Sequence, residues 1–462
     1  MNSQESACLI RCPGEICRLI FGHLLQEDLP AVCLSHRALR VHAEPLLYDS
    51  VYFEWREECH HPITSFLRSI LLRPQLAAYV RYFELTGGNG YDEPLDQAPK
   101  ILLSESALEE PLLWVARRTN IPYRESWMEE LRNGTMEAFI AVVISQATNL
   151  EKLNIWPDFI RGTSLIGEAL RSMVFRHADH GLPSQLNQLR DVFMRANSTS
   201  RDQTVDHYRN SRRATDLLLP FFYLPSVKRI EAEIDNPVEL SWPTKQPPRS
   251  NATSLKLFHL RESFLAQILS TTESLQSLRW EWYYDDRFDD GYALTPLVDL
   301  TKLAPALRYV QDTLVELTIA KDCLDKQGDY PRITIQGSLD ILSEFKVLKM
   351  LEFPLALQLG FSPHEAKQIE ACLPIGLERL FLTDAFSWVP GWKWKDHDIV
   401  NALEVWLESA QTITPKLHSL ELCFGSETYF YWRESATAKL DDMCKRAGID
   451  WGMQQTYSSR NK

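Results

Sequence analysis

The sequence predicts an α/β protein in which three short helices precede a solenoid with parallel strands on one face and helices on the other. Apolar residues recur at helical spacing in the first fifty residues, and a short apolar pattern then repeats along the rest of the chain. Amphipathic stretches of helical period separate its copies. At 462 residues the chain exceeds the roughly 250–300 residues that one core usually supports, so we expect repeats that bury each other.

The composition indicates a globular protein, with 45% hydrophobic and 24% charged residues. Its formal net charge of −13 argues against general binding to nucleic acid or to an anionic membrane. No segment reaches the roughly 20 apolar residues that span a bilayer, and Met1 to Ile10 lack the features of a secretory signal. We therefore expect a cytoplasmic or nuclear protein with no membrane partner.

The nine cysteines are scattered and no CxxC occurs, so we expect reduced thiols. The group Cys59-His60-His61 could suggest zinc, but the spacing of a metal finger is absent. We expect buried thiols, a surface histidine pair, and no metal or cofactor.

The helical segment is predicted over residues 8–50. Pro13 suits the first turn of a helix, and Asp28 suits the N-cap of a second one. A third helix is expected from Ser35 to Ala43, with Pro45 as its stop, because proline removes a helical hydrogen bond. The apolar stripe of the first helix consists of Ile16, Leu19, Ile20, His23 and Leu24. A strand is expected at Asp49 to Trp55, which alternates and is rich in aromatic residues.

The repeat array is predicted over residues 51–462 and carries the pattern L-x-x-L-x-L, with other apolar residues accepted in the leucine slots. The last two slots are two residues apart, so they face the same side of a strand. The copies are Val80-Phe83-Leu85, Leu150-Leu153-Ile155, Val227-Ile230-Ala232-Ile234, Leu255-Phe258-Leu260, Leu275-Leu278-Trp280, Leu314-Leu317-Ile319, Leu348-Leu351-Phe353, Leu377-Leu380-Leu382 and Leu417-Leu420-Leu422.

Helices are expected between these copies, and polar insertions near 196–213 and 236–253 interrupt the array. The expected helical positions are Phe264-Leu265-Ile268-Leu269, Leu297-Leu300-Leu303-Leu307, Ile341-Leu342-Phe345 and Ile399-Leu403-Trp406-Leu407. The end of the chain is typical of a cap. A helix over 438–446 would end at Gly448 in the left-handed conformation, and 449–453 would form a last edge strand.

Residues 12–48 resemble an F-box, and with the array behind them the chain resembles fungal-type F-box proteins with leucine-rich repeats. The matching positions are Pro13, Glu15, Ile16, Ile20, Phe21, Leu24, Asp28, Leu29, Val32, Cys33 and Arg37. The sequence departs from the F-box pattern at Cys12, where leucine is usual, and at Pro30 and Ser35-His36.

The resemblance implies that the helices dock on the Skp adaptor of a cullin–RING ubiquitin ligase and that the repeats hold a protein substrate. A bundle of roughly forty residues has too little core to stand alone, and a partner's helices would cover its leftover apolar face. The alternative for each residue is a place inside the bundle. The expected adaptor contacts are Pro13, Ile16, Leu19, Ile20, Leu24, Leu25, Leu29 and Val32.

Motifs of catalysis are absent: GxxxxGK[ST], GxGxxG, HExxH and GxSxG do not occur. We interpret Gly87-Gly88-Asn89-Gly90 as a loop, and the pairs Asp285-Asp286 and Asp289-Asp290 as an acidic loop without the ligand spacing of an EF-hand. A catalytic triad needs no fixed spacing, but nothing points to one. We therefore expect no enzymatic activity.

Aromatic clusters after two of the predicted strands suggest substrate contacts, because loops leaving strand ends border the concave surface of a solenoid. The expected contacts are Trp282, Tyr283, Trp388, Trp392 and Trp394, whereas Trp280 fills a leucine slot. Lys393 and Lys395 alternate with tryptophans, which could suit stacking on nucleic acid, but the acidity of the chain argues against it.

Three hypotheses follow. The first is substrate recruitment for ubiquitin transfer, and the second is an F-box scaffold or regulatory subunit that acts without ubiquitination. The third is a divergent enzyme with a site in the loops at 280–290 or 386–397.

Overall fold

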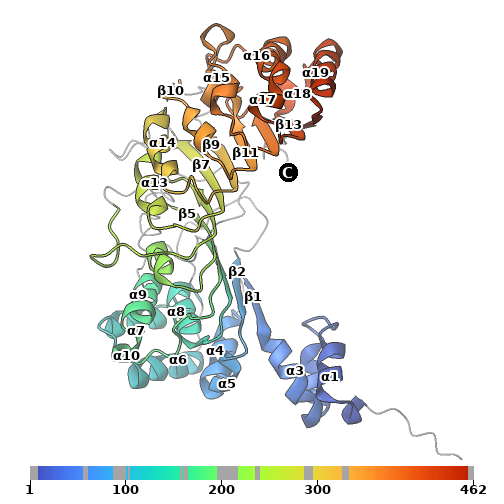
Figure 1. The fold of residues 1–462 in the computed structure, drawn as a ribbon. Coiled ribbons are helices and arrows are strands. Elements are labelled where there is room, and N and C mark those ends of the chain that lie inside the picture. Colours follow the sequence, from blue (N-terminus) through green and yellow to red (C-terminus); the bar gives the residue numbers. More distant parts are fainter. Residues whose placement is uncertain are drawn as a thin grey trace, which may run out of the picture. The chain divides into compact units, whose positions relative to one another are not determined.

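The computed structural model describes residues 9–55, 61–86, 100–101, 105–156, 159, 165–194, 217–234, 240–285, 295–324 and 332–455. The chain divides into two compact units, Met1–Gly90 with Leu95–Ala196, and Asn197–Lys462 with Tyr91–Pro94. Figure 1 shows strands and helices alternating along the chain in each unit. The helical segment belongs to the first unit, and its boundary with a repeat array near residue 50 stays a prediction.

The first unit begins with three helices around a small core of their own. They are α1 (Gly14–Phe21), α2 (Leu29–Ser35) and α3 (Arg37–Asp49), preceded by the 3₁₀ turn η1 (Leu9–Arg11). We call them the helical head. Its core consists of Cys17, Phe21, Leu29, Leu39 and Ala43.

One expectation about the helical head is wrong, and a second is confirmed only in part. Helix α3 does not stop at Pro45 but continues to Asp49, because the residues after the proline, Leu46 and Leu47, pack against the core of the head and offset the lost hydrogen bond. Asp28 occupies the N-cap of α2, but its side chain accepts no hydrogen bond there. A capping side chain is present instead on the next helix, α3. There His36 is the N-cap, and its Nδ1 accepts a hydrogen bond from the backbone N–H of Ala38.

Helix α3 runs directly into the first strand, β1 (Ser50–Glu54), so the head joins the rest of the first unit without a linker. A bidentate ion pair supports this junction. The Arg73 guanidinium, at the start of α5 (Pro74–Ala77), donates to both carboxylate oxygens of Glu44 over 2.7 and 2.6 Å. The hydrogen bonds from Arg73 hold the pKa of Glu44 below its usual range, so the pair stays charged.

The remaining elements of the first unit form a parallel sheet in the order β1-β2-β3-β4 with helices between the strands. Figure 1 shows these helices gathered beside the sheet. Their bounds are α4 (Ile63–Leu72), β2 (Tyr82–Thr86), α6 (Glu105–Arg118), α7 (Arg124–Arg132), α8 (Met136–Gln146), β3 (Lys152–Ile155), α9 (Leu165–Phe175), α10 (His177–His180) and β4 (Asp191–Met194).

The leucine slots of β2 and β3 face each other as expected: Phe83 pairs with Leu153 and Leu85 with Ile155, all of them buried. One copy of the repeat was not predicted from the sequence. Leu189, Val192 and Met194 are buried in the slots of β4, where a methionine fills the last position. Methionine can fill an apolar slot of the core as leucine does, so Met194 is buried although the pattern expects leucine there.

The second unit continues the alternation with eight parallel strands in the order β5-β6-β7-β9-β11-β12-β13-β14 among the described residues. The strands are β5 (Arg229–Glu233), β6 (Ser254–Phe258), β7 (Ser277–Asp285), β9 (Glu316–Leu324), β11 (Met350–Pro354), β12 (Arg379–Thr383), β13 (Ser419–Phe424) and β14 (Asp450–Gln455). A small second sheet pairs β8 (Leu297–Asp299) with β10 (Thr334–Gln336).

The helical elements of the second unit lie between these strands. They are η3 (Leu219–Tyr223), α13 (Glu262–Leu269), α14 (Leu300–Arg308), η4 (Asp340–Glu344), α15 (Leu355–Leu359), η5 (Pro363–Glu365), η6 (Ile369–Cys372), α16 (Asp396–Glu408), α17 (Ala410–Ile413), α18 (Ser426–Phe430) and α19 (Glu434–Ala447). Two expected helices differ in detail. Leu297 lies in β8 rather than in a helix, and the stretch around Ile341 is the 3₁₀ turn η4.

The register of β6 corrects one expected copy of the pattern. Leu255 pairs with Leu278 and Leu257 with Trp280, so the slots are Ala252-Leu255-Leu257 rather than Leu255-Phe258-Leu260. The run LKLFHL satisfies the spacing in two registers, and strand pairing decides between them. All five residues are buried.

The C-terminal cap is confirmed. Helix α19 ends at Gly448, whose φ of 73° is left-handed, and β14 follows as the edge strand.

Residues 240–253 form neither helix nor strand, as expected for an insertion. The insertion at 196–213, residues 236–239, the Gly87–Gly90 stretch, Cys59, His60 and Asp286, Asp289 and Asp290 lie outside the described residues.

Among the described helices, none combines the length and the apolar character that crossing a bilayer requires.

His61 was expected on the surface but is buried, with only 3% of the residue exposed. Its ring stacks on Trp55 at a centroid distance of 5.5 Å, and its Nδ1 accepts from the backbone N–H of Ile63 over 3.3 Å. Burial lowers the pKa of His61 to about 4.

This shift predicts an acid-sensitive first unit. Because the folded pKa of His61 lies below the usual value near 6.5, the unfolded state binds the proton first, and stability falls as the pH drops from about 6.5 to 4. We expect His61 to account for a loss of at most roughly 3 kcal/mol. The substitution His61→Asn keeps a side-chain acceptor for Ile63 but does not titrate, so it should flatten this part of the profile. Thermal or urea unfolding across the window measures it, and an unchanged slope would contradict the assignment.

Candidate functional site

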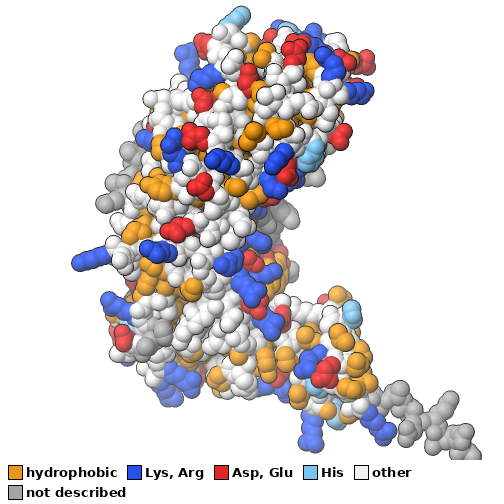
Figure 2. All heavy atoms as spheres, in the orientation of Figure 1, with side chains coloured by type: hydrophobic (Ala, Val, Ile, Leu, Met, Phe, Trp, Pro, Cys, Tyr) orange, Lys and Arg blue, Asp and Glu red, His pale blue; other side chains and the backbone are white. Residues whose placement is uncertain are grey.

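The helical head exposes an apolar surface. Helix α1 turns Cys17 and Phe21 into the core, which leaves the opposite side of the helix to solvent. The exposed fractions are 43% for Ile16, 64% for Leu19 and 41% for Ile20, and in the turn after α1 they are 37% for Leu24 and 64% for Leu25. Figure 2 shows hydrophobic side chains gathered on this part of the surface. We call these five residues the head patch.

The other expected adaptor contacts lie elsewhere in the head. Pro13 is exposed at the N-cap of α1. Leu29 is only 4% exposed and belongs to the core of the head, and Val32 packs partly buried against that core. The expectation that Leu29 faces a partner is therefore wrong, because its side chain is needed to hold α2 against α1 and α3.

Exposed apolar residues on α2 and α3 were missed. Leu34 on α2 is 87% exposed and Val41 on α3 is 67% exposed. Both lie off the helical stripes that identified the other positions. The signal available in the sequence was the position of each residue beside core residues: Leu34 follows the partly buried Cys33, and Val41 lies between the buried Leu39 and Ala43.

The second candidate surface is the outer face of the sheet in the second unit. The leucine slots point into the core, so the residues between them point to the other face. In the middle row of that face lie Glu231, Lys256, Arg279, Thr318, Glu352, Phe381, Glu421 and Gly452. This row mixes charges with a single aromatic ring, which is the kind of surface that a repeat array offers to a partner.

Three of the aromatic residues expected at a substrate surface are buried. Trp282 and Tyr283 are 1% and 2% exposed, because β7 extends to Asp285 and carries them along β9 instead of releasing them into a loop. The Arg261 guanidinium lies 5.0 Å from the centre of the Trp282 ring. Trp394 is also buried, and its Nε1 donates to the carbonyl oxygen of Gly360 over 2.9 Å. These placements correct the expectation.

Trp388 and Trp392 are partly exposed, as a contact role requires. They follow β12 in the chain. The ammonium of Lys321, on β9, lies 3.9 Å from the centre of the Trp388 ring, so β9 and the segment that follows β12 each bring one partner to this contact. The contribution of these two tryptophans to substrate binding stays a prediction.

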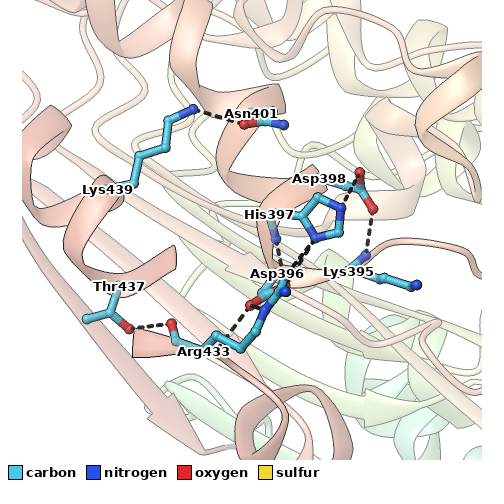
Figure 3. A network of polar contacts seen from close by, with 8 residues as sticks. All are labelled: Lys395, Asp396, His397, Asp398, Asn401, Arg433, Thr437 and Lys439. Carbon is cyan, nitrogen blue, oxygen red and sulfur yellow. Dashed lines mark hydrogen bonds and ion pairs between the residues drawn. The ribbon is translucent and has the colours of Figure 1, made fainter. Parts of the chain in front are cut away.

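A dense polar network lies in the stretch where an enzymatic site was considered, at the start of α16 (Figure 3). The carboxylate of Asp396 accepts three hydrogen bonds from Arg433, from its backbone N, Nε and Nη2 at 3.0, 2.7 and 2.6 Å. It accepts a fourth from the backbone N of His397 at 2.8 Å. The Arg433 guanidinium also lies 2.8 Å from His397 Nδ1.

The geometry of this network indicates a structural clamp. Arg433 is the N-cap of α19 and Asp396 opens α16, so the ion pair joins the first turns of two neighbouring helices. The Arg433 hydrogen bonds lower the pKa of Asp396 far below its usual range. A carboxylate that is fully ionised and saturated with donors is a weak proton acceptor, because a general base works best with a pKa near the working pH.

Cysteine chemistry and metals give no further site among the residues that the structure describes. Burial raises the pKa of the Cys444 thiol to about 12 and that of Cys372 still further, which keeps both protonated. The described part of the chain contains no group of three histidine, cysteine or acidic side chains placed to hold a metal ion.

These units of parallel strand, helix and buried apolar slot define a repeat protein that stacks its repeats through a shared core. The sequence matches the leucine-rich repeat domain over residues 57–429, and the chain belongs to this family. No curated protein matches it. A structure of the Rad7–Elc1 complex from yeast is similar to it at 11% identity over 90% of each chain, with a TM-score of 0.33. That likeness is too distant to inform function.

The clamp on α16 yields a stability prediction. Asp396→Asn removes the charge from a buried side chain that accepts four hydrogen bonds, so we expect the free energy of unfolding of the second unit to fall by about 2 kcal/mol at neutral pH. The folded pKa of Asp396 is depressed, so this contribution is present above about pH 4 and is lost as the pH falls further.

The control for this prediction is Asp442→Asn, which breaks an exposed ion pair with Arg446 and should change stability by less than about 0.5 kcal/mol. Denaturant unfolding of both variants at pH 7 and pH 3 measures the difference. Equal stabilities at pH 7 would show that the clamp contributes nothing.

Proposed function

We propose that this protein is the substrate-recognition adaptor of a Skp–cullin–F-box ubiquitin ligase. The helical head binds the Skp adaptor, the leucine-rich repeats bind a protein substrate, and the chain itself catalyses no reaction. It brings the substrate close to the ubiquitin-transfer machinery, and proximity supplies the rate. The proposal keeps the expectation that the protein works in the cytoplasm or nucleus.

The observation that carries the proposal is the head patch. Ile16, Leu19, Ile20, Leu24 and Leu25 are all more than a third exposed, although they are large aliphatic residues on a bundle whose own core is small. A contiguous apolar surface of this kind marks an interaction site, because covering it with another protein removes apolar area from water. Helices of a partner suit a surface that is itself helical.

The residues that match the F-box pattern fall into two groups, one in the core of the head and one on its surface. Among its matching positions, Phe21 and Leu29 hold the bundle together, whereas Ile16, Ile20 and Leu24 point outward. A docking module needs both groups, one to form the bundle and one to meet the partner. This division into core and surface residues supports an F-box role more directly than the match of residue types alone.

The junction of the head also suits an adaptor. Helix α3 continues into β1 without a break, and the Glu44–Arg73 pair joins α3 to the start of α5. Tyr48 at the end of α3 stacks near Phe66 of α4, with ring centroids 6.1 Å apart. A partner held by the head would therefore have a defined position relative to the first strands, as substrate presentation requires.

We predict that Ile20→Lys with Leu24→Lys abolishes binding to the Skp adaptor and leaves the repeats folded. Two buried charges would replace two apolar contacts, and an unpaired charge is costly in an interface. The matched control is Leu72→Lys with Leu113→Lys, which places the same charges on exposed positions of α4 and α6 in the same unit. Pull-down from cells and thermal unfolding give the two readouts.

Retention of the adaptor by the Ile20/Leu24 variant would contradict the head as the docking surface. Recovery of the adaptor and the cullin by the unsubstituted protein, with slower client turnover in the variant, supports ubiquitin transfer. Recovery of the adaptor without the cullin favours the scaffold alternative.

A further inference from the structure

The outer face of the sheet in the second unit carries two carboxylates on either side of an aromatic ring. Strands β11, β12 and β13 are paired in register, so Glu352 lies opposite Phe381, and Phe381 opposite Glu421. All three residues are partly exposed. Neighbouring strands lie roughly 4.8 Å apart, so the ring and the two carboxylates form one continuous strip. We call these three residues the acidic strip.

The basic side chains on the same face are already engaged. Lys256 pairs with Glu231 at 3.0 Å, Arg279 with Glu281 at 3.3 Å, and Arg379 with Glu316 at 3.9 Å. The first two pairs lie on β5, β6 and β7, before the strands of the acidic strip. The Arg379 pair joins β12 to β9 one row away from the strip. At each of these pairs, the positive and negative charges on the outer face of the sheet therefore cancel.

The two carboxylates of the acidic strip have only neutral partners. Glu352 Oε2 accepts from the Thr318 hydroxyl at 3.3 Å, and Glu421 Oε2 accepts from Gln454 Nε2 at 3.4 Å. No lysine, arginine or histidine of the described residues lies within ion-pair distance of either one. The face thus carries an excess of negative charge centred on the Phe381 ring.

A cysteine thiol lies beside the acidic strip. Cys423 lies one row beyond Glu421 on β13, and its pKa is raised to about 11. Burial is the first cause, and the charges of Glu352, Glu421 and Asp384 add to it.

We propose that the acidic strip binds a basic segment of a protein partner, with a lysine or arginine side chain over the Phe381 ring and between Glu352 and Glu421. A cation is attracted to the face of an aromatic ring, and each flanking carboxylate accepts a charge-assisted hydrogen bond from it. Charge complementarity of this kind selects the partner and speeds its approach. The proposal rests on the repeats being the substrate-binding part of the chain, and it specifies the chemistry of the substrate.

The test uses the full chain and a fluorescent peptide of alternating arginine and glycine, with an arginine-to-glutamine version as the uncharged probe. We expect the arginine peptide to bind, the glutamine peptide not to bind, and the affinity to fall as salt rises. Glu352→Gln with Glu421→Gln keeps the size of both side chains and should weaken binding by about tenfold or more. Phe381→Leu removes only the ring and should weaken it by about threefold.

The matched control separates the strip from the overall charge of the chain. Glu365→Gln with Glu408→Gln removes the same two charges from exposed positions on η5 and α16, away from the sheet face, and should leave the affinity unchanged. Thermal unfolding of each variant checks that it is folded. Absence of peptide binding at low salt would overturn the proposal. Equal weakening by both double variants would do so too, because binding would then follow net charge alone.

The head variant keeps this proposal distinct from the adaptor role. Ile20→Lys with Leu24→Lys should bind the arginine peptide as the unsubstituted protein does. Loss of peptide binding in the Glu352/Glu421 variant with the Skp adaptor retained supports the acidic strip. If the adaptor is not recovered by any form of the protein but the peptide still binds through the strip, the adaptor role fails and the basic-segment site stands.

Discussion

The structure depends on apolar side chains that only a neighbouring repeat can bury. Leu351 on β11 lies between Leu317 of β9 and Leu380 of β12, and the same register continues to Leu420 on β13. No single strand and helix encloses such a residue, so each repeat is stable because the next one is present. This requirement fixes which face of each strand carries the leucine slots, and the residues between the slots therefore point to the opposite face.

The two candidate surfaces follow from that constraint in different ways. The sheet face is a by-product of stacking: because Leu380 and Leu382 must point inward, Phe381 must point outward, between Glu352 and Glu421. The head patch arises because a bundle of three short helices buries one side of α1 and has nothing to cover the other. One surface is charged and the other apolar, so the two differ in the chemistry of the partner that each could contact.

Ion pairs between an exposed arginine and a more buried carboxylate join helices at the two ends of the described chain. Arg73 and Glu44 hold α3 to α5 where the head meets the first strands, and Arg433 and Asp396 hold α19 to α16 near the C-terminal edge. Both are bidentate arginine–carboxylate pairs, whose geometry resists rotation better than a single contact does. They lie where apolar burial alone would leave a helix free to shift.

The sequence by itself determined the repeat architecture, the positions of most leucine slots, the stripe on α1 and the cap at Gly448, because these depend on spacing and on residue chemistry within a few positions. Only the tertiary structure decided the register of β6, the burial of Trp282, Tyr283 and Trp394, the path of α3 through Pro45 and the role of Leu29. Each of these depends on which distant residue packs against the side chain. Local spacing shows that a residue is apolar and which way it faces, but burial is set by neighbours that the chain brings in from elsewhere.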